Sequence, residues 1–198
     1  MNESRIWLAV LAVATLCLFI IGRDLVENRD VKGVGRRVDI SPDLLTNGRV
    51  PMYDSANADY MLVEFMDYQC HPCQKMGLKL QPVLARPNFA PIIRQYPLFR
   101  VHPFAERAAR FALSVNDGPD SRAIHESLFR LRGSEDDWRD FLRNHANKRV
   151  RSAEEVDKRL KEDLLAAKAA NVQGTPQLFL IHGRNVYEVT SPELLVNL

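Results

Sequence analysis

The first apolar run of the chain, "IWLAVLAVATLCLFII" (6–21), is sixteen residues long and carries no charge. As a helix it would be about 24 Å long, slightly shorter than the roughly 30 Å hydrocarbon core of a membrane. It is therefore either the core of a signal peptide or a minimal membrane anchor. The small-x-small sequence Ala12-Val13-Ala14 lies inside the run, so cleavage there would leave "LCLFII" on the mature protein. We favour an uncleaved anchor over residues 1–22, inserted through residues 6–22.

After this run the pattern changes twice. Residues 23–44 are charged, contain two glycines and show no apolar period, so we expect a linker. A folded domain is expected over residues 45–198. Its first clear element is "YMLVEFM" (60–66), whose length and composition predict a buried strand. Residues 71–86 have helical spacing, and "APIIRQYPL" (90–98) predicts a second strand.

The middle of the domain is predicted to be helical. Ala, Leu, Arg and Glu dominate four stretches, at 102–116, 120–132, 134–147 and 152–171. Two strands follow, "QLFLIHG" and "NVYEVT", which form a hairpin through Gly183-Arg184, and Ser191-Pro192 can start a short helix. This order predicts an α/β fold with a helical insertion at about 102–171.

Composition and charge exclude several classes of protein. The 198 residues carry 27 basic and 25 acidic side chains, a formal net charge of +2, so no large electrostatic footprint for nucleic acid is present. Three cysteines are too few for a disulfide-stapled scaffold, and a domain of this length can build its own core.

Two of those cysteines, Cys70 and Cys73, lie three positions apart where the first strand runs into its helix. A pair at this spacing can hold half of a zinc site or can form a reversible disulfide. Zinc would need two further ligands. The histidines of the chain do not repeat at the spacing of metal ligands; they lie at positions 71, 102, 125, 145 and 182. We therefore expect redox chemistry, with no metal and no cofactor.

The two cysteines are expected to play different parts. Cys70, in the first turn, is exposed to the unpaired N–H groups and the positive end of the helix dipole, which favour the reactive thiolate. Cys73 lies one turn further along and is shielded by its own helix. Cys70 should therefore attack or be attacked, and Cys73 should resolve the mixed disulfide.

The motifs "VEFMDYQCHPC" and "VQGTPQLFLIHG" together resemble the DsbA-like thiol–disulfide oxidoreductases of the thioredoxin superfamily. The resemblance covers roughly residues 50 to 190. It implies a thioredoxin-like fold with an inserted helical domain and a cis Thr175–Pro176 bond beside the cysteines. A cis bond also explains why a proline leads into a strand, where it removes a ladder donor. Backbone groups of Thr175 are then expected to pair with an extended substrate beside Cys70.

Two further residues have a candidate role and a simpler alternative. His71 can stabilise the Cys70 thiolate and make the protein a better oxidant, or it can be a solvent-facing turn residue. The family usually has proline first and histidine second between the cysteines, and "CHPC" reverses that order. Glu64, six residues before Cys70, can accept a proton from Cys73 if it is partly buried, or it can face solvent on an edge strand.

The resemblance implies an envelope enzyme that exchanges the Cys70–Cys73 disulfide with cysteine-containing substrate proteins, mainly as an oxidant. A quinone-linked membrane partner would restore the disulfide. The alternatives are a reductase or isomerase fed by a membrane reductase, and a non-catalytic binding or assembly factor. We expect the domain to lie in the periplasm, anchored to a bacterial inner membrane. The basic residues after the apolar run instead favour the cytoplasm by the positive-inside rule, and this conflict stays open.

Overall fold

Five strands form one mixed sheet in the order β1-β5-β4-β2-β3. The computed structural model describes residues 3–31, 33–53, 58–115, 117, 119–131 and 134–198. The strands are β1 (Gly35–Val38), β2 (Tyr60–Met66), β3 (Phe89–Gln95), β4 (Gln177–His182) and β5 (Asn185–Val189). β2 and β3 are parallel, whereas the other three pairings are antiparallel. The predicted α/β order is confirmed.

Seven α-helices and two 3₁₀ helices complete the described chain. They are α1 (Glu3–Asp30), α2 (Pro42–Thr46), α3 (His71–Leu84), α4 (Ala105–Ser114), α5 (Pro119–Arg130), α6 (Glu135–Asn144), η1 (Ala146–Lys148), α7 (Ala153–Ala169) and η2 (Pro192–Asn197). Helices α4 to α7 lie between β3 and β4 in the chain, where the helical insertion was predicted. Three residues at which a predicted segment begins or ends lie outside the described residues: 1, 116 and 132.

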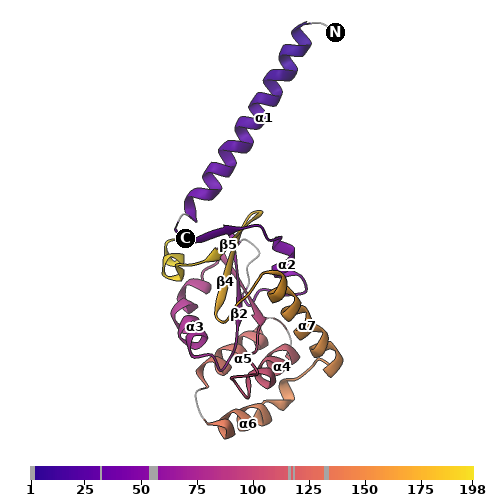
Figure 1. Cartoon of the computed structure of the whole chain (residues 1–198), viewed down its shortest axis with the longest axis vertical. Helices are drawn as coiled ribbons and strands as arrows, with labels where there is room; N and C mark the ends of the chain where they lie inside the picture. The colour runs from indigo at the N-terminus through magenta and orange to yellow at the C-terminus, as the bar shows by residue number, and fades with distance from the viewer. Residues whose placement is uncertain (1–2, 32, 54–57, 116, 118, 132–133) are drawn as a thin grey trace.

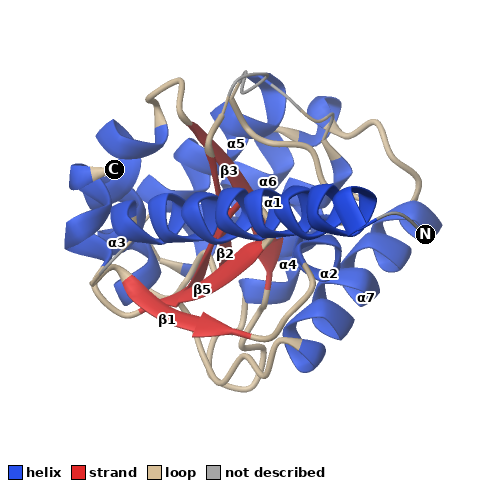
Figure 2. Cartoon of the chain, turned by 90° about the horizontal axis from the view of Figure 1, so that it is seen from above, coloured by secondary structure: helices blue, strands red, loops and turns tan. Residues whose placement is uncertain are grey.

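The helices cover both faces of the sheet. In Figure 2, α3 and α7 lie on opposite sides of the strands. Apolar side chains of β2, β4 and β5 alternate between the two faces, so one core packs on α3 and η2 and another on α2 and α7. A third core joins the α3 end of the sheet to α4, α5 and α6, and it contains both Cys70 and Cys73. Burial of apolar surface on both faces explains why β2 is apolar at every position except Glu64.

Residues 23–44, predicted as a linker, contain regular structure. Helix α1 continues to Asp30, β1 pairs with β5 at the sheet edge, and α2 follows. Gly35 is required there, because a Cβ at this position would lie 2.2 Å from the carbonyl oxygen of Glu188. A four-residue edge strand with two exposed arginines is too short and too polar to show an apolar period.

Helix α1 extends away from the rest of the chain (Figure 1). Among the residues whose side chains are described, no helix combines the length and the hydrophobicity that a membrane crossing requires.

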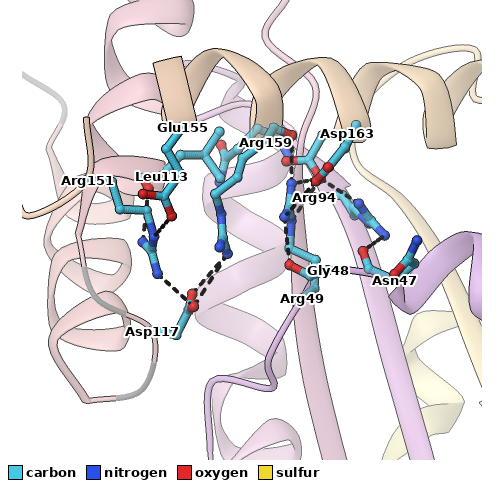
Figure 3. Close-up of polar contacts among 12 residues, drawn as sticks. Asn47, Gly48, Arg49, Arg94, Leu113, Asp117, Arg151, Glu155, Arg159 and Asp163 are labelled. Carbon is cyan, nitrogen blue, oxygen red and sulfur yellow. Dashed lines mark hydrogen bonds and ion pairs between the residues drawn. The ribbon is translucent and has the colours of Figure 1, made fainter. Parts of the chain in front are cut away.

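A buried group of charges attaches α7 to the sheet (Figure 3). Asp163 Oδ1 accepts hydrogen bonds from Arg49 Nη2 at 2.7 Å and from Arg94 Nη1 at 2.9 Å, and its Oδ2 accepts one from the Gln95 N–H at 3.0 Å. The side chains of Arg49, Arg94 and Asp163 are 4%, 1% and 0% exposed. Arg94 also donates to the carbonyl oxygens of Leu45 and Asn47 at the end of α2. One carboxylate thus connects α7, β3 and α2.

We expect Asp163→Asn to destabilise the domain by about 3–5 kcal/mol, because it removes the buried carboxylate that Arg49 and Arg94 share. The free energy of unfolding in urea measures this. Asp157→Asn is the matched control, since Asp157 pairs with Arg110 at the surface, where such pairs contribute less than about 1 kcal/mol. Equal losses in the two variants would contradict this assignment.

Candidate active site

The turn between β2 and α3 places Cys70 at the start of a helix. β2 ends at Met66, and Cys70 is the N-cap residue of α3 with an extended backbone (φ −70°, ψ 112°). Its N–H donates to the carbonyl oxygen of Asp67 at 3.1 Å, and its own carbonyl accepts from the Gln74 N–H at 3.1 Å. Pro72 suits the first turn of a helix because it lacks an N–H that would have no partner there. The sulfur of Cys70 therefore lies at the positive end of α3.

Asp67 determines the shape of this turn. Its Oδ1 accepts a hydrogen bond from the Gln69 N–H at 2.7 Å. Its Oδ2 lies 2.8 Å from both the Leu98 nitrogen and the Nδ1 of His102, on the segment that follows β3. Gln69 Oε1 accepts a further bond from the Phe104 N–H at 2.5 Å. These hydrogen bonds give Asp67, Gln69 and His102 a structural part in the turn.

Cys70 and Thr175 are brought together from positions 105 apart in the sequence. The Cys70 thiol donates to the Thr175 carbonyl oxygen over 3.3 Å. The Thr175–Pro176 bond is cis, as the sequence predicted. Thr175 Oγ1 is buried close to Cys73 and makes no hydrogen bond of good geometry with the described residues. The loop before β4 thus forms one wall of the site.

The two thiols have different environments. Cys70 is 4% exposed and Cys73 is 0% exposed, and they are not joined by a disulfide in this structure. Burial raises the pKa of Cys73, and the nearby Glu64 carboxyl raises it further, while a hydrogen bond from the Asp67 backbone opposes the shift. Cys73 is therefore held as a neutral thiol behind Cys70.

Glu64 is buried and does not lie on an edge strand. It is 3% exposed in the middle of β2, which pairs with β3 on one side and β4 on the other. Its Oε1 makes no hydrogen bond with the described residues. Burial raises the pKa of Glu64 to about 8. The solvent-facing alternative for Glu64 is therefore wrong, whereas a part in proton transfer stays a prediction.

His71 is exposed at the first position of α3. None of the hydrogen bonds found among the described residues joins its ring to Cys70 or Cys73. Its effect on the Cys70 thiolate therefore also stays a prediction.

His125 is a residue of the site region that the sequence did not single out. It comes from α5, and its Nδ1 lies 3.0 Å from the Tyr68 hydroxyl. Burial lowers the pKa of His125 to about 3, so the ring is neutral. It lines a cavity of about 40 Å³ together with Glu64, large enough for one water molecule. A lone histidine on an amphipathic helix gives no signal of this contact. Among the described residues, no three histidine, cysteine or acidic side chains are placed to hold a metal ion.

Three solved structures of bacterial proteins are similar to this chain. A periplasmic thioredoxin-like protein from Salmonella enterica is 24% identical with a TM-score of 0.61, over 80% of this chain and 99% of that chain. A linker-deletion variant of Proteus mirabilis ScsC is 20% identical with a TM-score of 0.61, over 98% of this chain and 90% of that one. The thiol-disulfide exchange protein alpha-DsbA2 from Wolbachia pipientis is 19% identical with a TM-score of 0.56, over 88% of this chain and 95% of that chain.

The chain has the fold of these proteins. The predicted resemblance to DsbA-like thiol–disulfide oxidoreductases is confirmed at the level of this fold. No protein-family model and no curated protein sequence matches the chain.

The raised pKa of Glu64 predicts a pH-dependent stability. Between the unfolded pKa of about 4.3 and the folded pKa of about 8, the folded protein holds the proton and the unfolded chain does not. The free energy of unfolding should therefore fall as pH rises through this window. From pH 5 to pH 8, the free energy of unfolding of the wild type should fall by on the order of 3 kcal/mol more than that of Glu64→Gln.

Urea unfolding of both proteins at the two pH values measures this difference. Glu193→Gln changes an exposed carboxyl and should follow the wild-type pH dependence. A constant difference between wild type and Glu64→Gln at pH 5 and pH 8 would show that Glu64 does not titrate in this window.

Proposed function

We propose that this protein is an envelope thiol–disulfide oxidoreductase that exchanges a Cys70–Cys73 disulfide with substrate proteins. The observation that carries the proposal is the position of the Cys70 sulfur, at the N-terminus of α3 and 3.3 Å from the Thr175 carbonyl oxygen, with Cys73 buried behind it. This arrangement offers one sulfur to a substrate and keeps the other for the resolving step.

In the oxidising direction, a substrate thiolate attacks the Cys70 sulfur of the disulfide. The S–S bond breaks, and Cys73 leaves with the electron pair and takes up a proton. A second substrate thiolate then attacks its own sulfur in the mixed disulfide and releases Cys70. The substrate loses two electrons and two protons, and the Cys70–Cys73 pair gains them.

Glu64 is proposed to carry the proton that Cys73 gains or loses. Its carboxyl contributes to the electrostatics at Cys73, and its pKa of about 8 lets it give or accept a proton near neutral pH. Thr175 and Pro176 are proposed to bind the substrate backbone beside Cys70. His71 is proposed to stabilise the Cys70 thiolate, which favours the oxidant role.

The proposed location is outside the cytoplasm, where thiols are not kept reduced by glutathione. A membrane partner, quinone-linked for an oxidant, would reoxidise the cysteines; a membrane reductase would serve the opposite direction. Residues 6–22 are proposed as the tether. The large apolar side chains described between Trp7 and Phe19 in α1 are exposed, and a lipid environment would cover them.

Cys70→Ser should reduce the rate of disulfide transfer to a reduced dicysteine peptide to the uncatalysed rate, because no sulfur remains at the attack position. Cys17→Ser, in α1 and remote from the site, is the control and should retain full activity. Retained transfer in Cys70→Ser would favour a binding or assembly factor instead. The equilibrium of the wild-type pair with glutathione reports whether the disulfide is oxidising enough for the proposed direction.

A reporter enzyme fused after Leu198 tests the location. An alkaline phosphatase fusion, which needs disulfides to fold, should be active, and a matched fusion to a cytoplasmic reporter should be inactive. The reverse result would mean that the positive-inside pattern decides the orientation. N-terminal sequencing of the mature protein distinguishes an anchor from a cleaved signal peptide.

A further inference from the structure

The helical insertion carries a cavity of about 650 Å³ between α4, α6, η1 and α7. Its charged lining among the described residues consists of arginines: Arg107, Arg110, Arg139, Arg143, Arg149 and Arg151. No described carboxylate lines it, although the whole chain has a net charge of only +2. We call this cavity the arginine groove. Apolar side chains of Phe111, Leu142 and Val156 also line it.

Aromatic rings hold several of these guanidinium groups. Arg107 and Arg139 lie over the ring of Phe104, at 5.5 Å and 5.6 Å from its centroid, and Arg149 lies over Phe111 at 5.1 Å. A guanidinium that stacks by its face keeps its N–H edge available for a carboxylate or phosphate. The stacked arginines are therefore partly ordered before any ligand binds.

Intramolecular partners neutralise only part of this charge. Four of the six arginines make ion pairs with seven carboxylates that lie outside the groove lining: Arg110, Arg139, Arg143 and Arg151. Arg107 and Arg149 are exposed, and no ion pair among the described residues involves them. The guanidinium groups of Arg107 and Arg149 are thus left for an external anion.

One end of the groove lies close to the candidate active site. Phe104, which supports Arg107 and Arg139, donates its N–H to Gln69 Oε1 at 2.5 Å, and Gln69 directly precedes Cys70. Phe104 also belongs to the apolar core that contains Cys70 and Cys73. A chain bound in the groove could therefore continue toward the Cys70 sulfur.

We propose that the arginine groove binds an acidic segment of the substrate polypeptide while Cys70 reacts with a cysteine elsewhere in the same chain. This rests on the proposed function and adds a substrate class to it. The mixture of guanidinium and apolar lining suits a peptide with acidic and apolar residues, and the volume lies in the range of ligand-binding clefts. A lipid headgroup fits less well, because α6 lies at the end of the molecule opposite α1, the proposed tether (Figure 1).

Binding of fluorescent peptides that contain no cysteine tests the groove separately from redox chemistry. One peptide carries a run of Asp and Glu with interspersed Leu, and its partner has Gln and Ser in place of the acids. The full-length protein should bind the acidic peptide more tightly, and 0.5 M salt should weaken that binding. Arg107→Gln/Arg149→Gln should weaken it by about tenfold and leave the neutral peptide unchanged.

Arg37→Gln/Arg184→Gln removes the same charge from exposed positions in β1 and the β4–β5 turn, and it should bind both peptides as wild type does. Circular dichroism checks that both double variants are folded. Equal binding of the two peptides by wild type, or equal loss in the two double variants, would overturn the proposal. So would binding of tripolyphosphate without binding of the acidic peptide, which would indicate a site for a small anion. A redox-inactive protein that still prefers the acidic peptide would disprove the proposed function alone.

Discussion

The geometry of the site depends on the hydrogen bonds that the buried carboxyl group of Asp67 makes. This carboxyl group accepts hydrogen bonds from the turn that leads to Cys70 and contacts the segment that leads from β3 into the helical insertion. Both segments leave the sheet at the same end of the strands, because β2 and β3 are parallel. Without such a contact, the backbone N–H groups of the turn would lack partners as the chain left the sheet. One side chain thus sets both the start of α3 and the approach of the insertion.

The different chemistry of the two cysteines follows from this arrangement. Cys70 is the last residue before the helix, where backbone N–H groups have no intrahelical partner. Cys73 is one turn deeper, in the same apolar core as Phe104 and Phe129, where burial raises its pKa. Glu64 enters the same region from the central strand. If Cys73 lay at the surface, its thiol would not be desolvated, and its pKa would lose the main cause of its shift.

The insertion is attached at two points that differ in chemistry. At its end, α7 returns to the sheet through the buried contacts of Asp163 with Arg49 and Arg94. At its start, the Phe104 backbone N–H donates a hydrogen bond to the side-chain Oε1 of Gln69. Between these points the helices surround the arginine groove, so the surface proposed to select substrates is built on the helical insertion and not on α3, which carries the cysteines. Specificity could then change in the insertion without change to the cysteines.

The sequence by itself determined the elements whose signal is local. The apolar run of β2, the helical spacing after Cys70 and the hairpin through Gly183 are each encoded within about ten residues, and all are present. The cis bond before Pro176 was also predictable, because a proline at a strand start is unusual and the Thr-Pro motif is specific. Only the tertiary structure decided features that join distant segments. β1 becomes a strand by pairing with β5 about 150 residues later, and four residues carry no period that would reveal it. The burial of Glu64 depends on β3 and β4 lying on either side of β2, and the contacts of His102 and His125 depend on where the insertion packs. Such placements are set by long-range packing, which the local order of residues does not contain.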